Sequence, residues 1–465
     1  MADHHLLIGG ELQSGASSFP VINPATEEPF STAPWASRRQ LDCAVEAAGD
    51  AFKTWRAAPT AERRVALLAL AQAVEASGSD LQSLLTQEVG KPSYEAQIEV
   101  ASAVAVLRYF ANAELPAERL ASASGATAVV HRKPLGVVAG ITPWNMPLLQ
   151  ACVKLGSAIA TGNTIILKPA PTTPLSALAL GALAAPIFPA GVVNVISDQH
   201  DLAPLLTEHP GVAKVGFTGS TTTARKVMAA CAPTLKRLTM ELGGSDAALV
   251  LRDADVKRTA RGLFGIAMFN CGQICTAPKR IYVHEDIYDQ LTDELCALAH
   301  GSVVGEAAAA GTTIGPVQNK SQLDKVVEYL ADAHAHGTVL TGGARLDRRG
   351  YFVPPTIVRD VTNGCRIVDE EQFGPIMPIV RYEDEDQALA LANDSPYGLG
   401  GSVWSNDPAR ARSIAAKLEC GQAWINRHGV SPADFPLAGA KLSGVGVELG
   451  DEGLKSYTQM TVVCD

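Results

Sequence analysis

The stretch "LGVVAGITPWNMPLLQACVKLGSAIATGNTIILKP", residues 135–169, contains the repeating unit on which the fold depends. It begins with an apolar run at 135–142 and ends with a second apolar run at 163–169. Residues 147–162 between them have the length and composition of a helix. Short apolar strands that alternate with helices are typical of a parallel sheet covered by helices. We therefore predict an α/β fold with a doubly wound parallel sheet.

The same alternation continues along the chain. "GVVNVIS", "VAKVGF" and "KRLTMEL" are further predicted strands, and a second series after about Gly244 ("RIYVHE", "PIMPIVRYE", "GGSVWS") predicts a second α/β domain. The first hundred residues are predicted to be mainly helical, because apolar residues such as Leu41, Val45 and Phe52 recur at helical spacing. "TAVVHRKP", residues 127–134, predicts a short strand that extends out of its domain.

Composition narrows the class of protein. The chain has 465 residues, 47% of them hydrophobic and 18% charged, which predicts a globular protein of two or three domains. A net charge of −10 without basic runs argues against nucleic-acid binding. The start "MADHHLLIGG" is unlike a signal peptide, and the longest apolar stretch is too short to span a bilayer. With nine scattered cysteines, these features predict a soluble, cytoplasmic protein.

Asn145 is the first candidate for chemistry. Pro143 and Pro147 bracket it in "ITPWNMP", at a strand-to-helix junction. Ligands of parallel sheets bind at the carboxyl ends of their strands, so the carboxamide could donate to an oxyanion. It could equally only cap the following helix.

Three further strand ends carry candidates. "GFTGSTTTA" offers Gly219, Ser220 and free N–H groups to a phosphate, although a plain helix cap by Ser220 is the commoner situation. Glu241 in "TMELGGSD" could be a general base or a solvated glutamate. Glu371 in "DEEQFGP" could hold ribose hydroxyls or lie in a surface turn.

Cys271 and Cys275 lie four residues apart in "FNCGQICTAP". A structural zinc site needs four ligands, and no second cysteine pair follows, so we expect no metal. A nucleophilic cysteine needs an oxyanion donor and a base, and Asn145 and Glu241 are candidates for both. A thiol or zinc protein built on the two cysteines remains an alternative that metal analysis would decide.

Taken together, "PWNMP", "GNTIILKPA", "FTGS", "ELGG", "GQIC", "EEQFGP" and "KLSGVGVELG" occur in the order typical of the aldehyde dehydrogenase superfamily. The resemblance extends from "INPATEE" at Ile22 to the C-terminus. It implies a Rossmann-like NAD(P)-binding domain (1–112 and 135–243), a catalytic domain (244–442), and a small β oligomerisation arm with the C-terminal tail (113–134 and 443–465). It also implies a homodimer or homotetramer.

By this resemblance, Cys275 is the nucleophile that attacks an aldehyde, and Cys271 is a bystander. Asn145 and the backbone N–H of Cys275 hold the oxyanion, and Glu241 activates the water that hydrolyses the thioester. Lys154 and Glu448 match positions that link the base to solvent in relatives, and either could instead be an ordinary ion-paired residue.

The resemblance also implies the cofactor groove. Lys168 resembles the adenosine-ribose lysine, Ser220 a pyrophosphate contact and Glu371 the nicotinamide-ribose carboxylate. Further groove positions are Trp144, Gly219, Leu242, Gly243 and Phe373. Many NAD-selective relatives have a glutamate three residues after the lysine, where this chain has Pro171. The loss of that carboxylate predicts that NADP is tolerated alongside NAD.

Other departures concern the pocket walls. Ala224, Ala438 and Val447 replace residues common in the family, and a methyl group at Ala224 is expected to restrict the pyrophosphate pocket. The substrate positions have few aromatic rings, which predicts a roomy tunnel for a larger, aromatic or semialdehyde substrate. These positions are Met146, Val153, Ser431, Leu437 and Arg427, the last as a possible partner of a substrate carboxylate.

Two rival readings remain within the family. A CoA-acylating enzyme passes the thioester to CoA, and such relatives usually lack the base that Glu241 supplies here. A non-catalytic structural or binding member tends to lose the nucleophile or the base, and this chain keeps both.

Overall fold

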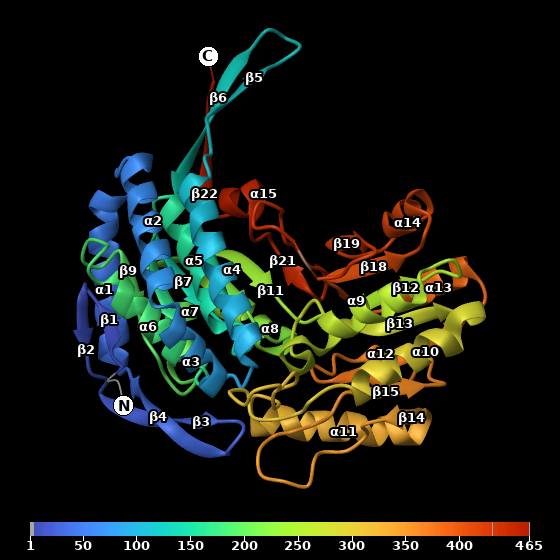
Figure 1. Cartoon of the computed structure of the whole chain (residues 1–465). Coiled ribbons are helices and arrows are strands. Elements are labelled where there is room, and N and C mark those ends of the chain that lie inside the picture. Colours follow the sequence, from blue (N-terminus) through green and yellow to red (C-terminus); the bar gives the residue numbers. More distant parts are fainter. Residues whose placement is uncertain (1–3, 430, 465) are drawn as a thin grey trace.

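Two large sheets, each with its own hydrophobic core, make up the body of the molecule in a computed structural model of the chain (Figure 1). The structure describes residues 4–429 and 431–464, so Val430 and Asp465, which fall within predicted segments, lie outside it. The first core takes its buried residues from Leu6 to Leu242 and adds Leu454 and Tyr457, and the second takes them from Ala247 to Ala415. The prediction of an α/β fold with two parallel-sheet domains is confirmed, whereas the predicted domain boundaries stay a prediction.

The first sheet has the strand order β2-β1-β9-β8-β7-β10-β11-β21. Its strands β9, β8, β7, β10 and β11 run parallel, with antiparallel strands at both edges. The bounds are β1 Leu6–Ile8, β2 Glu11–Gln13, β7 Val137–Ile141, β8 Thr164–Lys168, β9 Val193–Val195, β10 Val212–Thr218, β11 Arg237–Glu241 and β21 Gly444–Val445. Every residue of β7, β8 and β9 is buried, as expected where helices cover both faces of a parallel sheet.

Helices from the N-terminal half of the chain pack around this sheet (Figure 1). They are α1 Arg38–Trp55, α2 Thr60–Ala76, α3 Gly78–Glu88, α4 Ser93–Asn112, α5 Pro147–Ala160, α6 Leu175–Ala184, α7 Leu202–Glu208, α8 Thr221–Cys231 and the 3₁₀ turn η1 Ala232–Thr234. Helix α5 begins with a proline at its first position, where the missing N–H costs nothing. The loop between β7 and α5 therefore holds Asn145 where the sequence placed it.

The second sheet has the order β14-β15-β16-β13-β12-β18-β19, parallel except at the β14 edge. Its strands are β12 Asp246–Val250, β13 Pro278–His284, β14 Thr338–Thr341, β15 Thr356–Arg359, β16 Ile376–Tyr382, β18 Gly400–Trp404 and β19 Gln422–Ile425. Its helices are α9 Val256–Met268, η2 Phe269–Gly272, α10 Glu285–His300, α11 Lys320–His336, α12 Arg366–Asp369, α13 Glu385–Asn393 and α14 Pro408–Ala415. A two-stranded ladder joins β17 Tyr397–Gly398 to β20 Ala440–Lys441.

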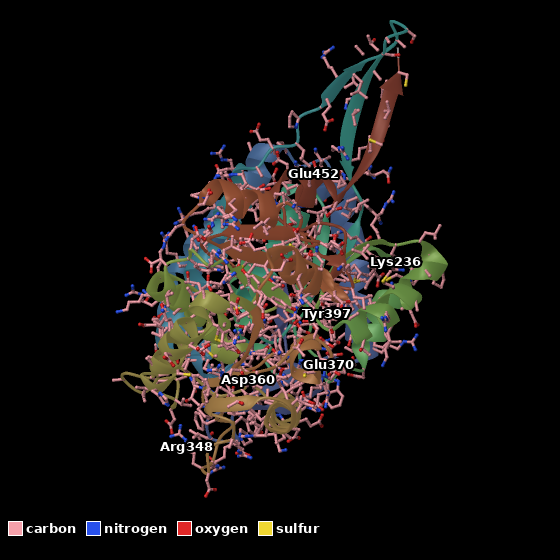
Figure 2. The ribbon with its side chains drawn as sticks, turned by 90° about the vertical axis from the view of Figure 1, so that its right-hand side faces the viewer. Lys236, Arg348, Asp360, Glu370, Tyr397 and Glu452 are labelled. Carbon is pink, nitrogen blue, oxygen red and sulfur yellow. The ribbon has the colours of Figure 1, made fainter. Side chains whose placement is uncertain are left out.

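A three-stranded antiparallel sheet projects from the body, and many of its side chains are exposed (Figures 1 and 2). It has the order β22-β6-β5, from Glu118–Ala121 (β5), Thr127–Pro134 (β6) and Thr458–Cys464 (β22), and α15 Gly450–Lys455 precedes β22. We call this sheet the arm. The strand that "TAVVHRKP" predicted is β6, with the same bounds.

The prediction of a mainly helical start was wrong for residues 4–35. They form β1, β2 and an antiparallel pair, β3 Ser17–Asn23 with β4 Glu28–Trp35. The turn between β1 and β2 is Gly9-Gly10, and both glycines have positive φ (62° and 88°). A Gly-Gly pair between two short apolar runs is a hairpin signal, and helix periodicity begins only at Arg38.

No helix in the described part of the chain is long and apolar enough to cross a membrane.

Candidate active site

Cys275 lies in a loop that follows three consecutive residues in the left-handed region, Asn270 (φ 51°), Cys271 (φ 56°) and Gly272 (φ 72°). A Cβ at Gly272 would collide with the carbonyl of Gly374, so this position requires glycine. Strained backbone of this kind persists where the surroundings hold it, typically at functional sites. The turn buries Cys271, whereas Cys275 is partly exposed to a cavity.

The cavity has a volume of about 1790 Å³, and most of the predicted site residues line it. Of the catalytic candidates, Asn145 and Cys275 do so, as do all eight predicted cofactor residues and all five predicted substrate residues. Glu241, Lys154 and Glu448 are not among the described residues that line it. The structure thus brings together residues that are more than a hundred positions apart in the sequence.

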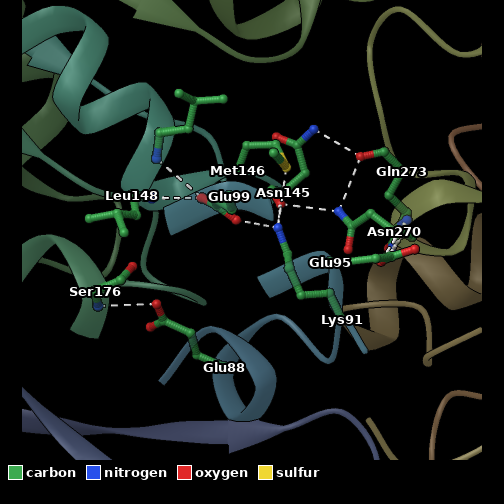
Figure 3. Close-up of polar contacts among 11 residues, drawn as sticks. Glu88, Lys91, Glu95, Glu99, Asn145, Met146, Leu148, Ser176, Asn270 and Gln273 are labelled. Carbon is green, nitrogen blue, oxygen red and sulfur yellow. Dashed lines mark hydrogen bonds and ion pairs between the residues drawn. The ribbon is translucent and has the colours of Figure 1, made fainter. Parts of the chain in front are cut away.

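Asn145 is almost fully buried, and its polar groups are held from several sides (Figure 3). Its side-chain Nδ2 donates to the carbonyl oxygen of Gln273 at 2.8 Å, two residues before Cys275. Its backbone oxygen accepts from Lys91 Nζ at 2.9 Å and from Asn270 Nδ2 at 3.1 Å. An amide nitrogen carries two hydrogens, so one N–H of Asn145 remains to donate at the cavity.

Burial raises the pKa of the Cys275 thiol far above its ordinary value, and the nearby carboxyl groups of Glu241, Asp246 and Glu371 raise it further. A backbone hydrogen bond with Thr276 offsets this in part. The thiol is therefore protonated at neutral pH and needs a base before it can attack.

Glu241 ends β11, and its Oε1 has no hydrogen-bond partner in the described part of the chain. Burial raises the pKa of this carboxyl well above its usual range, the carboxylate of Glu448 raises it further, and the ammonium of Lys154 lowers it. Lys154 Nζ is fully buried and donates to Glu448 Oε1 at 2.7 Å and to Thr218 Oγ1 at 2.8 Å. Lys154 is therefore hydrogen-bonded to Glu448, and its charge only partly offsets the effect of burial on the Glu241 carboxyl.

Six of the predicted cofactor residues lie at or just after the carboxyl ends of β7, β8, β10 and β11, and Glu371 and Phe373 come from the segment before β16. Ser220 caps helix α8, where its hydroxyl accepts from the N–H of Thr223 at 3.3 Å, so the plain capping role that the sequence left open is present. Trp144 and Phe373 meet edge to face with ring centroids 5.3 Å apart. Ala224, one of the departures from the family pattern, is buried inside α8.

The carboxyl group of Glu371 lies against Gly243 and Gly244, the two glycines that follow β11. The Oε1 atom of Glu371 accepts from the N–H of Gly244 at 2.9 Å, and a Cβ at Gly243 would collide with the same carboxyl group. Burial raises the pKa of Glu371 to about 7, although the Gly244 N–H and Lys279 act against it. The glycine at 243 is therefore required for the carboxyl group to point into the cavity.

Lys168 has a partner that the sequence did not reveal. Its Nζ lies 2.5 Å from Asp198 Oδ1, and both side chains are buried. Asp198 follows β9 and also accepts from the N–H of Leu202 at 2.8 Å, and neighbouring His200 lines the cavity with a positive φ of 75°. Asp198 comes directly after the predicted strand "GVVNVIS", and this position at a strand end was the feature of the sequence that could have marked it as a site residue.

The predicted substrate positions line the same cavity. Arg427 is exposed and makes no ion pair or hydrogen bond with any described residue. Next to it, His428 is buried, with Nδ1 2.8 Å from Ser402 Oγ and Nε2 3.2 Å from Asp246 Oδ2. Ser402 is fully buried, so this Ser-His-Asp arrangement fixes the imidazole and presents no accessible hydroxyl nucleophile.

Within the described residues, no three His, Cys, Asp or Glu side chains are grouped to hold a metal ion, and all nine cysteines are free thiols.

Sequence reasoning missed the buried polar groups that hold Asn145, chiefly Lys91, Glu95 and Glu99. Their signal was the spacing in "GKPSYEAQIE", where three charged residues recur at intervals of four. Glu95 and Glu99 share one face of α4, Lys91 lies just before that helix, and all three side chains are buried.

Comparison with known proteins agrees with this geometry. Residues 12–463 match the model of the aldehyde dehydrogenase family. The chain is 39% identical to "Aldehyde dehydrogenase LUC3" of a Fusarium species over 99% of this chain and 98% of that protein. It is 38% identical to the geranial dehydrogenase of Castellaniella defragrans over 98% and 97%. It is also 38% identical to a betaine aldehyde dehydrogenase of Vibrio vulnificus over 97% and 95%.

Solved structures are similar over the whole chain. The NAD+ complex of an aldehyde dehydrogenase from Bacillus cereus matches with a TM-score of 0.97 at 34% identity, covering 100% of this chain and 96% of that one. A betaine aldehyde dehydrogenase from Staphylococcus aureus, also with NAD+, matches with a TM-score of 0.96 at 32% identity, covering 100% and 98%.

Proposed function

The chain belongs to the aldehyde dehydrogenase family, and from that premise we propose that it oxidises an aldehyde to its carboxylic acid through a thioester on Cys275. The observation that carries the proposal is the shared cavity, onto which a thiol and an amide donor from different domains both open. Glu241 is near enough for its charge to raise the pKa of that thiol.

Cys275 and Asn145 have distinct roles in the proposed first step. After a base removes the thiol proton, the sulfur forms a bond to the aldehyde carbon and the carbonyl oxygen becomes an oxyanion. The free N–H of Asn145 and the backbone N–H of Cys275 would donate to this oxyanion, a contact that is strongest when the charge has developed. Loss of hydride from the same carbon leaves the thioester.

Glu241 is the proposed base for the second step. Its carboxylate takes a proton from water, the resulting hydroxide attacks the thioester carbon, and the carbon–sulfur bond breaks to release the acid and the thiolate. The unpartnered Oε1 of Glu241 supports this role, because a buried acceptor without a donor is available to a water molecule. The Lys154–Glu448 pair supports a path by which the proton could leave toward solvent.

The groove fits a nicotinamide dinucleotide. Ser220 lies at the N-terminus of α8, where free N–H groups favour a phosphate, and the Glu371 carboxyl group is aimed into the cavity beside Gly243. Lys168 and Glu371 would hold the two riboses, and Trp144, Gly219, Leu242 and Phe373 would line the groove. When bound, the nicotinamide would accept the hydride.

For the choice between NAD and NADP, we propose that both bind and that Asp198 limits NADP. Pro171 removes one carboxylate that would repel a 2′-phosphate. The ion pair between Lys168 and Asp198, however, already neutralises the cation that would attract this phosphate. Burial and the adjacent Lys168 lower the pKa of His200, so this side chain adds no positive charge at neutral pH.

The substrate is proposed to be a larger, aromatic or semialdehyde compound. Met146, Val153, Ser431 and Leu437 line the tunnel end of the cavity without an aromatic ring among them. The unpaired guanidinium of Arg427 would suit the carboxylate of a semialdehyde.

Two further features of the molecule stay proposals. The exposed apolar side chains of the arm support assembly into a homodimer or homotetramer, because an uncovered strand edge pairs readily. Nine free thiols support a reducing compartment, the cytoplasm.

A panel of aliphatic, aromatic and semialdehyde substrates, each with NAD and with NADP, tests the function. We expect reduced nicotinamide to form with at least one aldehyde, and the Cys275→Ala variant to form none. Analysis of the products with and without CoA separates the rival reaction, since acyl-CoA instead of free acid would identify a CoA-acylating enzyme. Turnover that survives Cys275→Ala would refute the proposal.

A further inference from the structure

We infer that Lys91 and Glu99, which are buried behind the active site, are positioning residues that hold the Asn145 carboxamide in the orientation needed to bind an oxyanion. This inference rests on the proposed function, in which Asn145 is the oxyanion donor. Neither residue lines the cavity among the described residues, so both would act only through Asn145.

Lys91 contacts the Asn145 loop directly. Its ammonium is fully buried, pairs with Glu99, and donates to the backbone oxygen of Asn145 at 2.9 Å. It also lies 3.2 Å from the sulfur of Met146 (Figure 3). A buried ammonium is strongly destabilising without its carboxylate, so the Lys91–Glu99 pair is expected to act as a unit.

Glu99 fixes the other end of the same loop. Its Oε1 accepts from the backbone N–H of Leu148 at 3.0 Å and of Leu149 at 3.2 Å, in the first turn of α5. These N–H groups have no partner within the helix, and a carboxylate also interacts favourably with the positive end of the helix dipole. Residues 145–149 are thus held from two places: Lys91, just before α4, binds the backbone oxygen of Asn145, and Glu99 of α4 binds the start of α5.

Asn270 and Gln273 complete the network on the cysteine side. Asn270 donates from Nδ2 to the backbone oxygen of Asn145, and its own N–H donates to Glu95 Oε2 at 2.9 Å. The carbonyl of Gln273 accepts one N–H of the Asn145 carboxamide. Lys91 and Asn270 hold the backbone oxygen of Asn145, and Gln273 holds one hydrogen of its carboxamide. These contacts fix the orientation of the carboxamide and therefore the direction of its second N–H.

This arrangement predicts that loss of the Lys91–Glu99 pair displaces the Asn145 carboxamide and leaves the Cys275 thiol in place. No contact of Lys91 or Glu99 reaches Cys275, and displacing a catalytic group by about 1 Å can cost roughly 10²-fold in rate. The effect should therefore appear only in reactions of Cys275 that form an oxyanion.

Two cofactor-free reactions of the same sulfur separate these effects. p-Nitrophenyl acetate acylates the thiolate: a sulfur–carbon bond forms through a tetrahedral oxyanion, and p-nitrophenolate leaves. Iodoacetamide alkylates it: sulfur displaces iodide from the methylene carbon, and no oxyanion forms. In both reactions the thiol proton goes to the buffer, and subtraction of the Cys275→Ala rate removes the contribution of other cysteines.

The chain offers a matched control in Glu88. Glu88 is the last residue of α3 and is fully buried, and like Glu99 it binds the start of another helix: its carboxyl oxygens accept from the N–H groups of Leu175 at 2.8 Å and Ser176 at 3.1 Å (Figure 3). The helix that it binds, α6, carries none of the proposed site residues. Glu88→Gln therefore removes a similar buried carboxyl group without touching the Asn145 loop.

We expect Asn145→Ala to slow acylation by about 10²-fold or more, as the loss of an oxyanion donor does. Lys91→Met, Glu99→Gln and the double variant, which leaves no unpaired charge, should slow acylation by about tenfold or more, within the range that a misplaced group costs. Alkylation should change less than about twofold in all of them, and Glu88→Gln should leave both rates unchanged. Thermal unfolding of each variant identifies those that remain folded.

The outcomes distinguish this inference from the function on which it rests. If Asn145→Ala slows acylation while the folded double variant does not, Lys91 and Glu99 do not position the donor. If acylation and alkylation fall together, or if Glu88→Gln slows acylation equally, the effect is a general loss of structure and the inference is wrong. If Asn145→Ala itself leaves acylation unchanged, the proposed role of Asn145 fails first.

Discussion

At the scale of single residues, the chemistry depends on how Cys275, Glu241, Lys154 and Glu448 share protons in a buried space. Only Lys154 brings a positive charge to this group, and it is bonded to Glu448. The pKa values of the Cys275 thiol and the Glu241 carboxyl are therefore both raised, first by burial and then by neighbouring carboxyl groups. The Cys275 thiol and the Glu241 carboxyl therefore keep their protons to higher pH than they would in water, and the proposed chemistry requires that these protons leave.

The pH dependence of turnover follows from these shifts. The active form needs Glu241 as a carboxylate, so raising its pKa moves the rise in kcat to higher pH. Glu448→Gln removes a carboxylate that raises this pKa, and the freed Lys154 then stabilises the Glu241 anion more strongly. We expect the kcat–pH profile of Glu448→Gln to move to lower pH, measured by steady-state assays across the pH range. A profile that moves upward would contradict this electrostatic account.

Asp198 gives a second prediction at this scale. Asp198→Asn leaves Lys168 with a free positive charge, so NADP should bind about tenfold more tightly relative to NAD, or roughly 1.4 kcal/mol. Pro171→Glu is the complementary variant and should weaken NADP selectively. Fluorescence titration of each dinucleotide measures both effects without substrate. Equal changes for NAD and NADP in Asp198→Asn would mean that the ion pair has no part in the choice.

At the scale of elements, α4 packs closely on α5, the helix that follows the Asn145 loop. Gly156 of α5 faces Phe110 of α4, and a Cβ at this glycine would overlap the phenyl ring. The glycine lets the two helices approach, and their approach lets Lys91 and Glu99 reach residues 145–149.

Gly156→Ala tests this packing. Overpacking a tight core costs about 1–3 kcal/mol, so we expect a clear loss of stability in thermal or denaturant unfolding. Gly49→Ala is the matched control, because Gly49 also lies inside a helix, α1, with open space around its Cβ position. That change should stabilise the protein by about 0.5–1 kcal/mol. Equal effects of the two variants would show that helix propensity alone decides the outcome.

The elements also show what periodicity can and cannot predict. The strands and helices from 135 to 241 were predictable because each is a short buried run or a helix of ordinary length. The hairpins before Arg38 were missed because β1 and β2 have only three residues each, and because β3 and β4 are partly exposed and contain prolines, which argue against a strand. The Gly9-Gly10 turn was their most specific signal.

At the scale of the whole molecule, the arm exposes apolar side chains that nothing within the single chain covers among the described residues. Leu120, Met460, Val462 and Val463 are each about half exposed on it. Apolar side chains gathered on a projecting sheet are typical of a surface that another protein covers.

Val462→Lys tests the assembly. Light scattering should give the native protein a mass of two or four times 48.6 kDa, and the variant a smaller mass. Val65→Lys is the control, since Val65 is an exposed valine of α2 away from the arm and its replacement should leave the mass unchanged. A native protein that is monomeric at micromolar concentration would refute the proposed assembly.

The candidate site was predictable to the extent that its residues fall in short motifs. Asn145, Glu241 and Cys275 follow or precede predicted strands, and the order of their motifs indicates the family. Lys91, Glu99 and Asp198 were not predicted, because their importance lies in contacts with residues 30 to 60 positions away, and one sequence does not reveal such pairs. Buried charged residues of this kind are recognised only when the fold shows what they touch.

The most direct test of the central claim is the mass of the Glu241→Gln variant after incubation with NAD and a reactive aldehyde. Without its base, the enzyme should form the thioester and fail to hydrolyse it. We predict one acyl group per subunit, located on Cys275 by peptide mapping, together with one equivalent of reduced nicotinamide. Reduced nicotinamide without an acyl group on Cys275, or an acyl group on another residue, would contradict the account.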